Sequence, residues 1–139
     1  MNRVLALATV AALAVTGPAL AAISAGAKAP EIHANAYQDG KPSHFMLSQA
    51  LKKGPVVLYF FPGAFTPGCN VEAQQFAASI DKFQAAGATV VGVTGYYGKA
   101  ARNSADQGGL EQAVKDFSKE HCNGKFPVAA VDGATIKAY

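Results

Sequence analysis

Charged residues are scarce in this chain, and no segment collects charge of one sign. Lysine, arginine, aspartate and glutamate make up 15% of the 139 residues, whereas half of the residues are hydrophobic. This balance excludes an intrinsically disordered chain, which has too little apolar surface to bury. The formal net charge is only +3 and the lysines are scattered, so we expect no nucleic-acid partner. The length suits one domain with a real core.

Long hydrophobic runs are missing after the N-terminus. Arg3 gives a positive start, an apolar run covers residues 4–15, and Ala19-Leu20-Ala21 is a small-x-small cleavage site. This layout is typical of a secretory signal peptide, and the run is too short to span a bilayer. We predict a signal peptide over residues 1–21, a periplasmic or secreted domain over residues 22–139, and no membrane contact after cleavage. An uncleaved anchor is the alternative.

Cysteine is also scarce, since only Cys69 and Cys122 occur. In an exported protein, two cysteines by default form a structural disulfide. A Cys-x-x-Cys motif is absent, because Thr66 lies three residues before Cys69 and Glu72 lies three residues after it. That absence argues against a thioredoxin-like disulfide exchanger. The residues around Cys69 favour a reactive thiol over the structural disulfide.

Strand and helix patterns alternate along the chain. Two strand patterns, 32–37 and 43–47, flank the turn signal Asp39-Gly40 and predict an N-terminal hairpin. Three later apolar runs predict buried parallel strands, with helices before and between them. The predicted strands cover residues 56–61, 88–94 and 126–131. The predicted helices cover residues 48–53, 68–86 and 110–122, and Ser48 is expected to cap the first of them. The order predicts an α/β sandwich with ligand chemistry at the carboxyl ends of its strands.

Cys69 lies at the predicted start of a helix. Thr66 is a suitable N-cap because the following Pro67 disfavours helical geometry at its position. Pro67 then takes the first helical position and Cys69 the third, at the positive end of the helix dipole. This setting favours the thiolate, which is the nucleophile for disulfide exchange and for peroxide attack. The alternative is a helix-capping loop with a buried cysteine, which leaves the choice of cysteine unexplained.

The segment from Pro62 to Cys69 resembles the peroxiredoxin signature Pro-x-x-x-Thr-x-x-Cys. The local sequence of this segment, Pro-Gly-Ala-Phe-Thr-Pro-Gly-Cys, is similar to that of the mitochondrial-type atypical peroxiredoxins. Its flanks, Glu72 and Phe126-Pro127-Val128-Ala129, are similar to the bacterioferritin-comigratory branch. The resemblance covers nearly all of residues 27–139. It implies a thioredoxin-like sandwich with central parallel strands.

The resemblance also implies a mechanism. Cys69 would be the peroxidatic cysteine, which attacks the O–O bond and becomes a sulfenic acid. The Thr66 hydroxyl would hold the peroxide, and Pro62 would shield the sulfur. The backbone N–H groups of Gly68 and Cys69 would hydrogen-bond the peroxide oxygens. The substrates implied are hydrogen peroxide or small alkyl hydroperoxides, and the reductant implied is a thioredoxin-like or low-molecular-weight thiol. A homodimer is one expected assembly. No metal, haem or flavin is required.

Two features depart from the family. The family normally has an arginine beyond the third buried strand, but the sequence stops at Tyr139, before that segment and before the closing hairpin and last helix. The one arginine after residue 21 is Arg102, to which we assign no role. We therefore expect a peroxiredoxin-like domain that is truncated at its C-terminus. The alternative is a degenerate redoxin domain that senses oxidant or binds a partner with little turnover.

A resolving cysteine five residues after the peroxidatic one, common in the comigratory branch, is also absent, because Gln74 stands there. Cys122 is the remaining candidate for resolving Cys69, and a single-cysteine mechanism stays open. The three histidines, His33, His44 and His121, fit no metal-ligand spacing. We expect them to be scattered surface residues.

Overall fold

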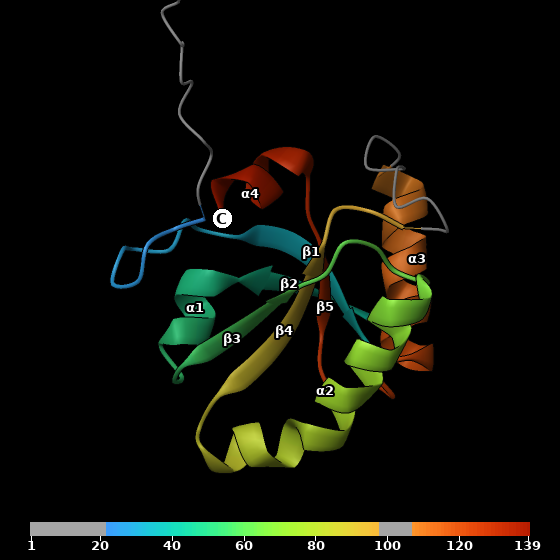
Figure 1. Ribbon diagram of the computed structural model, residues 1–139, viewed down its shortest axis with the longest axis horizontal. Coiled ribbons are helices and arrows are strands. Elements are labelled where there is room, and N and C mark those ends of the chain that lie inside the picture. The colour runs from blue at the N-terminus through green and yellow to red at the C-terminus, as the bar shows by residue number, and fades with distance from the viewer. Residues whose placement is uncertain (1–21, 98–106) are drawn as a thin grey trace, which may run out of the picture.

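The computed structural model describes residues 22–97 and 107–139. The predicted signal peptide and Arg102 lie outside the described residues. Figure 1 shows a central sheet with helices on both faces. In chain order the elements are β1 (His33–Gln38), β2 (Lys41–Met46), α1 (Leu47–Leu51), β3 (Val56–Phe60), α2 (Pro67–Ala85), β4 (Thr89–Thr94), α3 (Gln107–Glu120), β5 (Val128–Ala130) and α4 (Gly133–Ala138).

The sheet has five strands in the order β2-β1-β5-β4-β3. Strands β3, β4 and β5 run parallel, while β1 is antiparallel to both β2 and β5. The turn between β1 and β2 places Asp39 and Gly40 at φ values of 51° and 71°. Two successive positive φ values are what a tight Asp-Gly hairpin turn requires. The structure thus confirms the predicted α/β fold with central parallel strands and an N-terminal hairpin.

Two apolar clusters fill the space on the two faces of the sheet. One joins α2 and α3 to the sheet and contains Phe117 and Phe126, both almost fully buried. The other joins α1 and α4 to the opposite face through residues such as Leu47 and Ile136. The sheet is therefore the middle layer of a sandwich (Figure 1). The α2 side of this sandwich contains both cysteines.

Some predicted boundaries were wrong. Helix α3 ends at Glu120, so that Cys122 follows the helix instead of closing it. The residue before α1 is Met46, and the Ser48 backbone N–H donates to Glu31 Oε1 at 3.1 Å, so Ser48 is not a cap. The last strand begins at Val128, two residues later than predicted, because Pro127 has no N–H to donate to a neighbouring strand.

No helix within the described ranges combines the length and the apolar character needed to cross a bilayer.

Candidate active site

The loop from Pro62 to Thr66 follows the carboxyl end of β3 and leads into α2. Its backbone is tied to the neighbouring segment, since Ala64 N–H donates to the carbonyl oxygen of Tyr96 at 3.1 Å. Ala64 and Tyr97 also form an isolated parallel bridge. The loop therefore lies beside the carboxyl ends of adjacent parallel strands. In α/β sheets this edge is where ligands bind.

Thr66 precedes α2 with an extended backbone (φ −90°, ψ 145°), and Pro67 is the first helical residue. Both positions agree with the sequence prediction. The Thr66 side chain does not cap the helix, however. Its hydroxyl donates to the carbonyl oxygen of Gly63 at 3.0 Å and thereby braces the loop. The first-turn N–H groups of Gly68 and Cys69 have no intrahelical acceptor, because no carbonyl lies four residues before them in the helix.

Cys69 lines an open groove at the start of α2. Its residue is only 4% exposed. The groove has a volume of about 630 Å³ and brings together four of the five predicted site residues, all but Cys122. Its lining consists of Pro62, Thr66, Gly68, Cys69, Val71, Glu72 and Gln75. The groove therefore brings Cys69, the Thr66 side chain and the first turn of α2 together in one place.

Tyr59 and Glu72 form a hydrogen bond beside this groove. The Tyr59 hydroxyl donates to Glu72 Oε2 at 3.1 Å, and its ring packs against Phe76 with centroids 4.3 Å apart. Burial, followed by the nearby Glu72 carboxylate, raises the pKa of Tyr59 well above its usual value. The tyrosine therefore stays a protonated donor that fixes the carboxylate one helical turn after Cys69. The sequence pattern did not reveal this pair, because the two residues belong to different elements.

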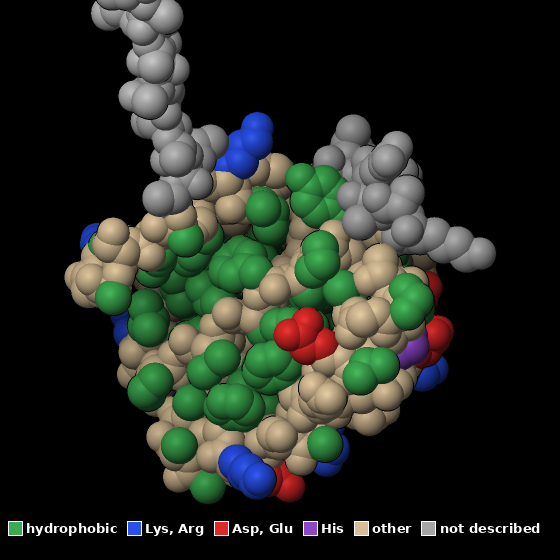
Figure 2. Space-filling model, viewed as in Figure 1, with side chains coloured by type: hydrophobic (Ala, Val, Ile, Leu, Met, Phe, Trp, Pro, Cys, Tyr) green, Lys and Arg blue, Asp and Glu red, His purple; other side chains and the backbone are tan. Residues whose placement is uncertain are grey.

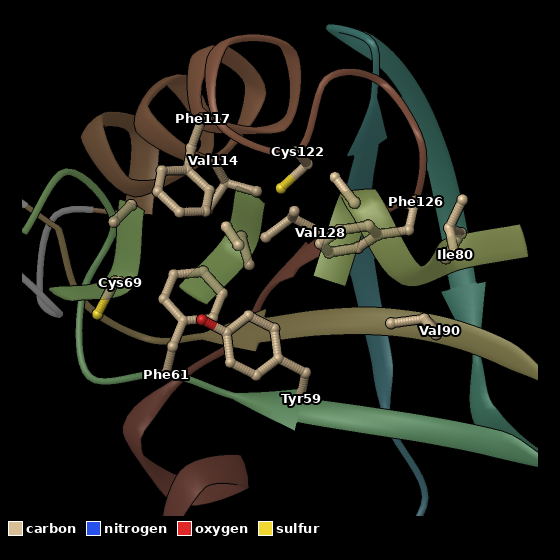
Figure 3. Close-up of a cluster of buried hydrophobic side chains, with 14 of the residues drawn as sticks. Tyr59, Phe61, Cys69, Ile80, Val90, Val114, Phe117, Cys122, Phe126 and Val128 are labelled. Atoms are coloured by element: carbon tan, nitrogen blue, oxygen red, sulfur yellow. The ribbon is translucent and has the colours of Figure 1, made fainter. Parts of the chain in front are cut away.

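Cys122 is completely buried, and neither cysteine is in a disulfide. Both belong to one apolar cluster, and in Figure 3 side chains including that of Phe117 lie between them in the view. Burial raises the pKa of the Cys122 thiol to about 12. A thiol in this setting is a poor nucleophile, because the thiolate is the attacking form. The arrangement brings Cys122 into the same cluster as Cys69 but does not pair the two.

Phe65 and His121 are site neighbours that the sequence analysis missed. Phe65 has a φ of +64°, and its ring meets the His121 ring edge-on at a centroid distance of 5.4 Å. His121 is half-buried, and its Nδ1 is buried without a hydrogen-bond partner. The prediction that His121 is a surface histidine was therefore wrong, because Phe65 and Phe117 enclose its ring. No local signal in the sequence indicates this contact between distant segments.

Across the described residues, no three His, Cys, Asp or Glu side chains come together closely enough to hold a metal ion.

Comparisons with solved structures agree with this architecture. The chain is similar to peroxidoxin BcpB from Mycobacterium tuberculosis, with a TM-score of 0.61 and 25% identity, over 82% of this chain and 64% of that one. It is also similar to the reduced 2-Cys peroxiredoxin from Plasmodium vivax, with a TM-score of 0.55 and 23% identity, over 76% of this chain and 61% of that one. These likenesses support the thioredoxin-like sandwich.

Curated relatives match over a shorter segment. A chloroplastic peroxiredoxin Q from Populus jackii is 51% identical over 59 residues, which are 42% of this chain and 26% of that protein. A putative peroxiredoxin, MT1643, from Mycobacterium tuberculosis is 44% identical over 57 residues, 41% of this chain and 36% of that protein. The chain thus matches only 26% and 36% of the length of these two relatives. The AhpC/TSA family model, in contrast, matches residues 25–139, and the chain belongs to the AhpC/TSA family.

Proposed function

We propose that this protein is a thiol peroxidase that reduces hydrogen peroxide or small alkyl hydroperoxides at Cys69. The observation that carries the proposal is the groove at the start of α2, where Cys69 meets Pro62, Thr66 and Gly68. The sulfur of the Cys69 thiolate attacks one peroxide oxygen. An S–O bond forms as the O–O bond breaks, which leaves a sulfenic acid. The second oxygen leaves as hydroxide or an alkoxide and takes up the proton that the thiol released on ionising, which gives water or an alcohol.

The neighbouring groups support this reaction in distinct ways. The Thr66 hydroxyl donates its hydrogen to the carbonyl oxygen of Gly63. The lone pairs of the Thr66 hydroxyl oxygen can therefore accept a hydrogen bond from a peroxide O–H. The N–H groups of Gly68 and Cys69 face the charge that develops on the oxygens, and the positive end of the α2 dipole adds to their effect. Pro62 is exposed at the rim of the groove and limits the access of water to the sulfur.

An external thiol, thioredoxin-like or of low molecular weight, then regenerates Cys69. The thiol attacks the sulfenic sulfur and releases water, and a second thiol reduces the mixed disulfide. The full burial of Cys122 and the raised pKa of its thiol support this route over an internal disulfide. A Cys69–Cys122 bond would require the loop and the first turn of α2 to unwind.

The test compares two matched substitutions, Cys69→Ser and Cys122→Ser, in peroxide consumption with a dithiol present. We expect Cys69→Ser to abolish consumption and Cys122→Ser to retain it. Mass spectrometry after peroxide treatment should find a sulfenic-acid adduct on Cys69 and no Cys69–Cys122 link. Unchanged turnover in Cys69→Ser would contradict the proposal. Oxidation of Cys69 without turnover would instead support a degenerate redoxin domain that senses oxidant.

Export and assembly remain predictions with their own measurements. The N-terminal sequence of the protein recovered from a periplasmic fraction tests cleavage after Ala21. For assembly, the relevant feature is β3, which pairs only with β4 among the described strands. Figure 2 shows hydrophobic side chains gathered over the side of the molecule where β3 forms the sheet edge. An unpaired apolar edge favours association, and sedimentation at several protein concentrations tests the expected homodimer.

A further inference from the structure

Strand β3 forms one edge of the sheet, and its sequence carries none of the features that usually protect such an edge. Among the described strands it pairs only with β4. Its five residues are Val-Val-Leu-Tyr-Phe, without a charge, a proline or a glycine. All of them except Tyr59 are only half-buried, and Figure 2 shows apolar side chains gathered on this side of the molecule. An unprotected edge of this kind is a site for an added strand.

Every second residue of β3 turns its backbone polar groups away from β4. The carbonyl oxygen of Pro55 accepts a hydrogen bond from the first residue of β4 at 2.9 Å, and the Phe61 N–H donates to β4 at 3.1 Å. The odd-numbered residues from 55 to 61 thus face β4. Successive strand residues point their N–H and C=O groups to opposite sides. One N–H and one C=O therefore face outward from each of Val56, Leu58 and Phe60.

A second, antiparallel copy of β3 matches this pattern. A two-fold axis at Leu58 places this residue opposite its own copy and places Val56 opposite Phe60. Residues that lie opposite each other in this way exchange both of their hydrogen bonds. All the outward N–H and C=O groups of the strand then have partners, and apolar side chains pair on both faces of the joined sheet. A shift of the register would leave one end of each strand unpaired.

The same register brings the start of one copy of β3 beside the end of the other. Lys53 precedes the strand, whereas Pro62 and the Cys69 groove follow it. Within one chain, five strand residues separate them by about 17 Å. In the antiparallel pair, Lys53 of the second copy comes to the rim of the groove at Pro62. Glu72 is the charged residue among the described residues that line this groove, so the charges that meet there are complementary.

We propose that two copies of this chain pair along β3 and that each copy supplies Lys53 to the Cys69 groove of the other. The ammonium group stabilises the thiolate and the negative charge that develops on the departing peroxide oxygen. The described lining of the groove contains no cation of its own, so a single copy holds an incomplete site. The contribution of Lys53 to turnover rests on the proposed function, whereas the pairing of β3 does not.

Sedimentation of the full chain tests the pairing without any peroxide. Leu58→Lys places two like charges directly opposite each other at the two-fold axis, which disfavours the pair. Gln112→Lys is the matched control, because it adds the same residue on the exposed side of α3, a helix that packs over β1 and β5. We expect the unmodified protein and the control to form dimers, and Leu58→Lys to raise the dissociation constant about tenfold. A monomeric unmodified protein would overturn the proposal, as would equal dissociation constants for the two variants.

Hydrogen exchange of the unmodified protein keeps the test decisive if Leu58→Lys does not fold. The outward N–H groups should be protected at a protein concentration that favours the dimer and should exchange quickly on dilution. These groups belong to Val56, Leu58 and Phe60. The N–H groups of Val57 and Tyr59 face β4 and should be protected at both concentrations. Exchange of the outward groups that does not depend on concentration would contradict pairing along β3.

Mixing two impaired variants tests whether Lys53 acts across the interface. Lys53→Ala should slow peroxide reduction about tenfold. Lys53→Arg should retain the rate, and so should Lys52→Ala, because the Lys52 ammonium group donates to Gln49 Oε1 instead. Cys69→Ser lacks the reactive thiol but keeps Lys53. A mixture of Cys69→Ser and Lys53→Ala should therefore exceed the summed rates of its components, since a mixed dimer places an intact Lys53 beside an intact Cys69.

The possible failures can be told apart. A mixture that shows no gain would overturn the role of Lys53. A dimer that consumes no peroxide would overturn the proposed function, while the sedimentation comparison would still decide whether β3 is the interface.

Discussion

Thr66 joins the loop before α2 to the helix itself. Its extended backbone ends the loop, and its carbonyl oxygen accepts the first helical bond, from Asn70 N–H at 3.0 Å. Its hydroxyl turns back to Gly63 O instead of forward to the helix. One residue thus fixes both the shape of the loop and the direction in which the first-turn N–H groups point. The bond from the hydroxyl group to Gly63 O, and not the size of the Thr66 side chain, braces the loop.

We therefore expect Thr66→Val to slow peroxide reduction by about a hundredfold, because it removes one oriented polar group at the reacting oxygens. Thr66→Ser keeps the hydroxyl and should retain most of the rate. Loss of the bond to Gly63 O should also lower the free energy of unfolding of Thr66→Val by about 1 kcal/mol. Stopped-flow measurement of peroxide reduction and urea unfolding of both variants check these values. Equal rates for the two variants would contradict a role for the hydroxyl.

At the scale of elements, the turns that precede the parallel strands β3 and β4 meet at Gly54 and Gly87. Gly54 lies between α1 and β3 with a φ of +147°, and Gly87 lies between α2 and β4. A Cβ on Gly54 would come within 2.5 Å of the Gly87 carbonyl oxygen. Nearby, Thr89 N–H donates to Pro55 O at 2.9 Å. This close backbone approach sets how β3 lies beside β4, and β3 leads directly into the Cys69 loop.

Gly54→Ala should therefore lower the free energy of unfolding by about 2 kcal/mol, since it combines a strained φ with a backbone clash. Gly133→Ala is the matched control, because a Cβ there meets nothing within 4 Å. Gly133 is the first residue of α4, where alanine is readily accommodated. Urea denaturation of both variants measures the difference. Equal unfolding midpoints would show that the two turns can move apart at little cost.

For the molecule as a whole, burial affects several ionisable groups in one direction. Burial raises the pKa of Cys122 from an ordinary 9.0 to about 12. Burial also raises the pKa of Tyr59, with a further contribution from Glu72. The pKa of Tyr37 is also raised, by burial and by its hydrogen bond to Glu111. Each of these groups is neutral when protonated, so the folded state prefers the protonated form more strongly than the unfolded chain does.

This preference predicts alkaline destabilisation. A group whose pKa is raised by folding contributes stability that is fully present below its pKa in the unfolded chain. This contribution is lost as the pH rises toward its pKa in the folded state. For Cys122 the window runs from 9.0 to about 12. The free energy of unfolding, measured in urea, should thus be level near neutral pH and fall through that window. Cys122→Ala should reduce the slope there, whatever its effect on stability at neutral pH. A level curve across the window would contradict the burial of these groups.

Several parts of the fold could be predicted because their signals are local. Asp39-Gly40 determines a tight turn through backbone preferences of two adjacent residues. Thr66-Pro67 determines a helix start in the same way, and the apolar run at 56–61 determines the strand before it. The prediction that this strand is buried on both faces was wrong, because β3 is an edge strand of the sheet and only Tyr59 in it is buried. The boundary error at Ser48 has a different origin. There, the backbone N–H donates to the side chain of Glu31, which belongs to a distant segment.

By itself the sequence determined the α/β order of elements and the place of Cys69 between a strand and a helix start. Only the tertiary structure decided which distant side chains surround that thiol. The pairing of Tyr59 with Glu72 and the docking of Phe65 on His121 depend on how α2 and α3 pack on the sheet. Turn and capping preferences act over a few residues, whereas such contacts depend on packing between whole elements. The same packing buried Cys122, which the count of two cysteines could not reveal.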